Sequence, residues 1–170
     1  MKEQILAQLS ADYPWKEYLH CFESIDSTND RLREMARKGA PHGTVLIADH
    51  QTGGRGRLGR SFLSPAGVGI YLSAILRPQV RPEQLLHLTA MAAEYLSRAI
   101  LEVCGVQPGI KWTNDLVLNR RKICGILTEL SVEAESGLVQ YVVVGIGVNC
   151  NQREFDDTTS AIATSLALET

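Results

Sequence analysis

Long hydrophobic runs are missing from this sequence. The longest uninterrupted apolar stretch covers residues 141–148, less than half of the roughly 20 residues that a membrane-spanning helix requires. The first ten residues contain Lys2, Glu3 and two glutamines among their apolar positions, so they lack the hydrophobic core of a secretory signal. We therefore expect a cytoplasmic protein without a membrane partner.

Paired cysteines and clustered histidines are absent too. The four cysteines are Cys21, Cys104, Cys124 and Cys150, and their wide separation does not match the paired spacing of zinc sites or redox dithiols. The four histidines are equally scattered. The sequence therefore predicts free thiols and no protein-bound metal.

A positive net charge is also lacking. The 17 lysines and arginines are outnumbered by 19 acidic residues, which gives a net charge of -2. No global positive field can therefore drive sequence-independent binding to nucleic acid, and any anion site must be local. The 170 residues, of which 45% are hydrophobic and 21% charged, are enough for one globular domain and too few for two.

Apolar periodicity and turn residues predict an α+β fold. Polar N-cap residues at 24–30 precede a helix that Gly39 ends, and a longer core helix covers residues 82–105. The β-type runs are residues 44–48, 69–76, 109–112, 116–118, 123–132 and 138–148. Short separators at 119–121 and 133–137 fit hairpins. We expect one domain over residues 1–170, with a mixed, mostly antiparallel sheet covered by helices on one face.

An arginine loop is the sharpest local anomaly. Residues 53–60, which we call the arginine loop, contain four glycines and the three arginines Arg55, Arg57 and Arg60. Glycines allow a close backbone approach, and guanidinium groups pair with carboxylate or phosphate oxygens, so this composition is typical of an anion site. A solvated surface loop is the alternative. The glycines match G-x-G-x-x-G, but no helix follows, which excludes a Rossmann dinucleotide site.

A second group of polar residues lies at a break between two β-type runs. It comprises Lys111, Trp112, Thr113, Asn114 and Asp115. In a nucleotide enzyme the tryptophan could stack on a purine, the lysine could face phosphate, and the last two residues could orient a nucleotide or a metal-bound water. A turn beside a core tryptophan is the alternative.

Two weaker signals lie on the later strands. Lys122 opens an apolar strand in which Gly125 would leave room for a ligand, although a lysine there also fits a hairpin flank or an edge protector. Two glycines and Asn149 end the last strand, and alone they indicate a bulge or a turn.

Taken in order, these segments resemble the biotin protein ligase family. The matching strings are DSTN at 26–29, GGRGRLGR at 53–60, KWTND at 111–115, RRKICGILTE at 120–129 and GIGVN at 145–149. The resemblance implies a catalytic core related to class II aminoacyl-tRNA synthetases. It also implies an ATP-dependent enzyme that converts biotin and magnesium-bound ATP into biotinyl-5'-adenylate. The biotinyl group then passes to a lysine of the biotin carboxyl carrier domain of a biotin-dependent carboxylase.

The resemblance also assigns roles to residues. Arg55 and Lys122 would be catalytic, with Lys122 bridging the two anions that must meet. Biotin would be bound by Ser27, Thr28, Asn29, Gln51, Arg55, Gly56, Arg57, Lys122 and Gly125. The nucleotide would be bound by Arg57, Lys111, Trp112, Asn114, Asp115 and Asn149. Such a mechanism needs no enzyme nucleophile.

Family members continue through further helices and a small SH3-like barrel, so the resemblance implies a catalytic domain that is incomplete at its C-terminus. The residues before Ser24 are too few for the winged-helix domain of repressor-type relatives, so we do not expect DNA binding. Two alternatives stay open. One is a lipoate-type ligase, which shares the fold and the adenylate chemistry but whose loop usually leads to His-Asp. The other is a biotin-binding module that is catalytically incomplete.

Overall fold

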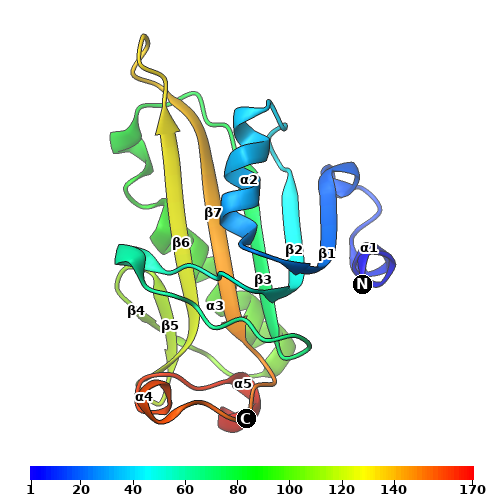
Figure 1. The fold of residues 1–170 in the computed structure, drawn as a ribbon, viewed down its shortest axis with the longest axis vertical. Helices are drawn as coiled ribbons and strands as arrows, with labels where there is room; N and C mark the ends of the chain where they lie inside the picture. The colour runs from blue at the N-terminus through cyan, green and yellow to red at the C-terminus, as the bar shows by residue number, and fades with distance from the viewer.

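A seven-stranded mixed sheet forms the centre of the molecule (Figure 1). The computed structural model describes residues 1–170, and the strands lie in the order β1-β2-β3-β7-β6-β5-β4. Their bounds are β1 Leu19–Ile25, β2 Val45–Gln51, β3 Gly69–Leu76, β4 Gly109–Lys111, β5 Asp115–Leu118, β6 Arg121–Val132 and β7 Val139–Asn149. Only β1 and β2 pair in parallel, and every other neighbouring pair is antiparallel. The α+β prediction is confirmed.

Strand β1 was not predicted from the sequence. It occupies one edge of the sheet, and three consecutive residues in its middle, Phe22, Glu23 and Ser24, are exposed. An edge strand with one neighbour buries little of its surface, so it can carry His, Cys, Glu and Ser without the apolar alternation that marks a buried strand.

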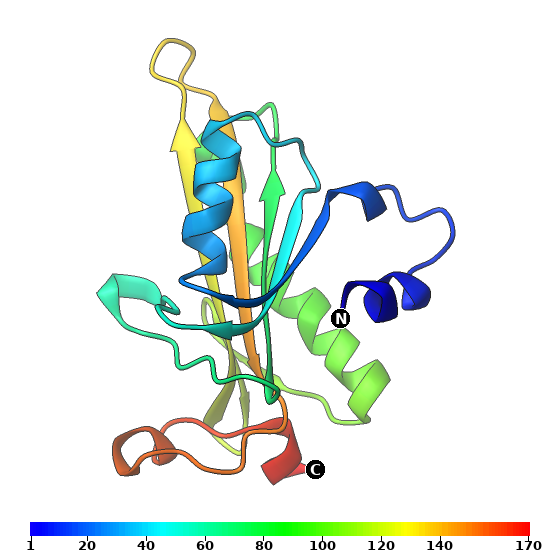
Figure 2. The same ribbon diagram turned by 45° about the vertical axis from the view of Figure 1, so that its right-hand side comes forward.

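Helices cover both faces of the sheet, so the expectation of helices on one face was wrong. On one face, Leu32 and Ala36 of α2 (Thr28–Arg37) pack with Val143 of β7. On the other, Ala93 of α3 (Leu88–Cys104) packs in the same cluster as Val142 of β7. Neighbouring residues of one strand point to opposite faces, which places the two helices on opposite sides, as Figure 2 shows.

The two long helices begin and end at residues with a clear local role. The Ser27 hydroxyl accepts a hydrogen bond from the Asp30 amide at the start of α2. Gly105 follows α3 with a φ of 72°, a left-handed conformation that glycine adopts without strain. The predicted helix over residues 82–105 is interrupted, because Pro82–Leu85 forms a 3-10 turn, η3, before α3 begins. The remaining short helices are α1 Lys2–Gln8, η1 Lys16–Tyr18, η2 Arg57–Gly59, α4 Asp157–Ser160 and α5 Leu166–Glu169.

Two segments without long helices or strands lie next to the sheet, namely the arginine loop and the C-terminal segment. The arginine loop follows β2 and crosses in front of β7 and β6 (Figure 1). The C-terminal segment, with α4 and α5, lies across the end of β5 and β6, where the Lys122 amide donates to Ile162 at 2.9 Å. No helix of the structure combines the length and apolar character needed to cross a bilayer.

Candidate active site

An open cavity lies between the start of α2, the arginine loop, the turn before β5 and the strands β6 and β7. Segments far apart in the chain therefore share one space. Ten of the residues predicted for a site line it: Ser27, Thr28, Asn29, Gln51, Arg55, Gly56, Arg57, Asn114, Lys122 and Gly125.

One end of the cavity is a buried polar network at the start of α2. The Gln51 side-chain oxygen accepts from the Thr28 amide at 2.9 Å and lies 3.0 Å from the Thr28 hydroxyl. The Ser73 hydroxyl lies 2.8 Å from the Thr28 hydroxyl and 2.5 Å from the Asn29 side-chain oxygen. Thr28, Asn29 and Ser73 are all buried. Because every group is held by another, this end presents fixed donors and acceptors to a polar ligand.

Glycines form the floor of the cavity. A side chain at Gly147 would come within 2.6 Å of the Phe62 ring, and one at Gly125 within 2.9 Å of Lys122 Nζ. At Gly145 a side chain would overlap the Asn29 amide. The glycines therefore let Phe62 and Lys122 lie directly on the sheet. We call the apolar part of the cavity, lined by Phe62, Ile126 and Leu127, the slot.

Lys122 places an ammonium group at this slot. Its Nζ lies 2.7 Å from Asp115 Oδ1 and 5.9 Å from the centre of the Phe62 ring. The side chain is 32% exposed, so its charge is only partly screened by water. Its backbone is fixed between β5 and the C-terminal segment, because the Lys122 carbonyl also accepts from Thr164 at 2.9 Å. Lys122 therefore presents a cation to an anion in the cavity from a fixed backbone position.

The arginine loop is attached on both sides of the cavity. On one side, Arg55 contacts Asp30 at 2.5 Å and Glu129 at 3.2 Å. On the other, Arg57 donates to the Thr113 hydroxyl and to the Asn114 side-chain oxygen, both at 2.9 Å. The loop therefore bridges the mouth of the cavity from α2 to the turn that precedes β5.

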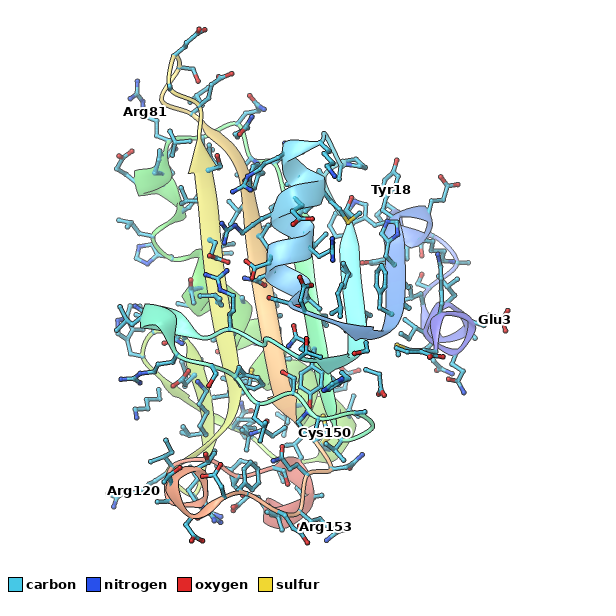
Figure 3. All side chains as sticks on the ribbon, viewed as in Figure 1. Glu3, Tyr18, Arg81, Arg120, Cys150 and Arg153 are labelled. Atoms are coloured by element: carbon cyan, nitrogen blue, oxygen red, sulfur yellow. The ribbon has the colours of Figure 1, made fainter.

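Four predicted site residues do not line the cavity. Lys111 and Trp112 are exposed on the edge beyond β5, and Trp112 is 72% exposed. Asp115 contacts two residues that line the cavity, because it pairs with Lys122 and accepts from the Asn114 side-chain nitrogen at 3.0 Å. Asn149 is buried and donates to the Thr164 carbonyl at 3.0 Å, which ties the C-terminal segment to β7. Arg81, Arg120 and Arg153 lie at the two ends of the molecule, away from this site (Figure 3).

Sequence reasoning missed several residues of the site. Phe62, Ser73 and Leu127 were not predicted, nor were the acidic partners Asp30 and Glu129. Asp30 directly follows the DSTN string and Glu129 ends the RRKICGILTE string, but their pairing with Arg55 spans 25 and 74 residues, and no local pattern encodes it.

No cysteine of the chain is a candidate nucleophile in this cavity. Cys124 lies between Ile123 and Gly125 but faces the α3 side of the sheet, in the same core cluster as Ala93. Burial raises the pKa of its thiol well above the ordinary value. No group of three or more His, Cys, Asp and Glu side chains is arranged to hold a metal ion.

The chain is similar in sequence and in fold to proteins of one known family. Residues 21–149 match the model of the biotin/lipoate A/B protein ligase family. The chain belongs to this family. Among solved family structures, the biotin protein ligase of Aquifex aeolicus in complex with biotin and ATP superposes with a TM-score of 0.72 and 37% identity, over 87% of this chain and 59% of that one.

The chain is also similar in sequence to two further bacterial ligases. The bifunctional ligase/repressor BirA of Bacillus subtilis is 41% identical over 153 residues, which are 89% of this chain and 46% of that protein. The biotin–[acetyl-CoA-carboxylase] ligase of Mycobacterium tuberculosis is 36% identical over 167 residues, 94% of this chain and 60% of that protein. The chain therefore spans about half the length of these two relatives.

Proposed function

We propose that this chain carries the biotin-activating site of an ATP-dependent biotin protein ligase. The observation that carries the proposal is the meeting of Lys122 with the arginine loop at one cavity, whose other end is a buried polar network. The similarity to ligases that bind biotin and ATP supports it. A polar end, an apolar slot and a cationic end match, in that order, the ureido ring, the valerate chain and the carboxylate of biotin.

The polar end would select the ring of biotin. The ureido group has two N–H donors and one carbonyl acceptor, so it needs oppositely matched groups on the protein. Thr28, Asn29 and Gln51 supply hydroxyl and amide groups whose orientation is already fixed by hydrogen bonds within the polar network that includes Ser73. Preorganised partners lose little entropy on binding, which favours tight and selective recognition of a small ligand.

The cationic end would reduce the repulsion between the biotin carboxylate and the phosphate of ATP. An oxygen of the biotin carboxylate attacks the α-phosphorus of ATP, the bond from that phosphorus to the bridging oxygen breaks, and pyrophosphate leaves. Two anions must approach each other in a cavity where their repulsion is weakly screened. Lys122 and Arg57 would offset this repulsion and stabilise the charge that develops on the phosphoryl oxygens. No proton moves in this step.

In the second step, the amine of an acceptor lysine would attack the acyl carbon of the adenylate, the bond to the phosphate oxygen would break, and AMP would leave with the electron pair. The amine loses a proton. We propose the biotin carboxyl carrier domain of a carboxylase as the acceptor, by analogy with the named relatives. Magnesium would enter as the ATP complex.

The test is adenylate formation by the chain itself. Incubation with radiolabelled biotin and ATP should give labelled biotinyl-5'-adenylate and pyrophosphate, and addition of a carrier domain should give a labelled protein. Tight binding of biotin without any adenylate would instead favour a binding module. Selective turnover of lipoate would favour a lipoate-type ligase. No binding of biotin at all would refute the proposal.

A further inference from the structure

Four charged side chains form a compact cluster beside the mouth of the cavity. Arg33 of α2 lies 3.2 Å from Asp30 and 3.1 Å from Glu129. Arg55 of the loop lies 2.5 Å from the same Asp30 oxygen and 3.2 Å from the same Glu129 oxygen. Two guanidinium groups therefore share two carboxylates, and the loop arginine competes with a helix arginine for them.

Glu129 also contacts the polar end of the cavity. Its second oxygen accepts from the Asn29 side-chain nitrogen at 3.0 Å, and Asn29 in turn accepts from the Ser73 hydroxyl. One carboxylate thus holds both the arginine loop and a side chain of the polar end of the site. Of the four charged groups, Glu129 is the least exposed, with 23% of its side chain accessible, so its interactions are the least screened by water.

Arg55 and Arg57 of the loop differ in the charge of their partners. Arg55 faces carboxylates, so its charge is balanced within the cluster. Arg57 is bound by a hydroxyl and an amide oxygen, both neutral, so its charge stays uncompensated. An anion in the cavity gains more from a cation whose charge is not already balanced.

We propose that Glu129 is a positioning residue, which acts through Arg55 to hold the arginine loop across the cavity while Arg57 faces the anionic ligand. This inference rests on the proposed ligase function for its role in catalysis. Its structural content, an electrostatic attachment of the loop to α2 and β6, stands independently of that function.

The attachment can be measured without substrate by trypsin. Cleavage after Arg57 and Arg60 requires the loop to leave the protein surface, so its rate follows the population of the detached loop. In Glu129→Gln the shape and the hydrogen-bonding oxygen are kept but the charge is lost. We expect cleavage at these bonds to become about three- to tenfold faster, the range expected for loss of a partly exposed ion pair.

Arg33→Gln supplies the opposite perturbation. It removes the competing guanidinium and leaves the carboxylate pair with Arg55 alone, so we expect slower cleavage than in the natural chain. A purely structural role would give faster cleavage in both variants, because each would loosen the fold. Glu94→Gln, which removes a carboxylate paired with Arg98 on α3, is the matched control and should leave cleavage unchanged.

The same variants test whether attachment of the loop affects retention of the adenylate. The dissociation rate of preformed biotinyl-5'-adenylate should rise in Glu129→Gln by the factor seen in proteolysis. Unchanged cleavage in Glu129→Gln, or faster cleavage in Arg33→Gln, would overturn the inference. If Glu129→Gln does not fold, as judged by circular dichroism, Asp30→Asn replaces it with the same expectation. If the natural chain forms no adenylate but the cleavage pattern holds, the ligase function fails and the loop attachment stands.

Discussion

Replacing Lys122 by methionine separates the chemistry of the site from its stability. Methionine keeps most of the unbranched stem and removes the ammonium group, which leaves Asp115 without its partner at 2.7 Å. The two side chains are 32% and 21% exposed. The pair is thus neither a surface pair, worth up to about 1 kcal/mol, nor a fully buried one, whose disruption costs about 3 to 5 kcal/mol.

We therefore expect a loss of about 1 to 2 kcal/mol in the free energy of unfolding. A domain with an ordinary stability of at least about 5 kcal/mol would then stay more than about 99% folded at 25 °C. The loss of a cation that stabilises transition-state charge has a larger effect, about 100- to 1,000-fold in rate. Unfolding cannot account for a decrease of that size.

The assay is ATP–pyrophosphate exchange dependent on biotin, with the melting temperature measured on the same samples. Lys38→Met, at the exposed end of α2, is the matched control and should keep the natural rate. An exchange rate of Lys122→Met within about threefold of the natural one, in a folded protein, would refute the electrostatic role of Lys122.

Three further predictions follow from other contacts. Gly147→Val would force the Cβ to within 2.6 Å of a phenylalanine ring atom, so we expect biotin affinity by calorimetry to fall at least about tenfold, and unchanged affinity would argue against the slot. Iodoacetamide should label the exposed Cys104 and spare the buried Cys124 in the folded chain, and equal labelling would contradict this core. Hydrogen bonds, first from Thr164, hold the pKa of Glu169 below its usual range. Its stabilisation is therefore complete above the ordinary glutamate pKa of about 4.3 and is lost as the pH falls through the lower folded value. Glu169→Gln should make the melting temperature less dependent on pH over this acidic range. An unchanged dependence would show that protonation of Glu169 does not control the stability there.

The central strands were predictable from sequence because their surroundings are uniform. Strand β7 is buried on both faces between α2 and α3, and β6 is buried on its α3 face, so both strands are largely apolar in sequence. Their predicted and observed bounds differ by two residues at most. Strand β1 lies at an edge, and its residues 20–24 mix Phe22 with His20, Glu23 and Ser24 in no regular alternation, so the sequence does not predict a strand there. Which face each helix covers is a property of chain connections, which periodicity does not encode.

The residues of the site also fall into a group that the sequence predicted and a group that it did not. Glycines and cations stood out in the sequence because their types are unusual together, as in the arginine loop and around Lys122. Their partners did not, since Asp30, Glu129 and Ser73 are ordinary residues that gain a role only from contacts across the fold. The short sequence around a residue therefore indicates which chemistry its side chain can perform. Which charges lie next to that side chain depends on contacts between distant segments in the folded chain.

The most direct test is a crystal structure of this chain with biotin and a non-cleavable ATP analogue. It should place the biotin carboxylate and the α-phosphate together within hydrogen-bonding distance of Lys122 Nζ, with Arg57 on the phosphate and the ureido ring against Thr28 and Gln51. Ligands bound outside this cavity, or a Lys122 that stays with Asp115 and touches neither anion, would contradict the account.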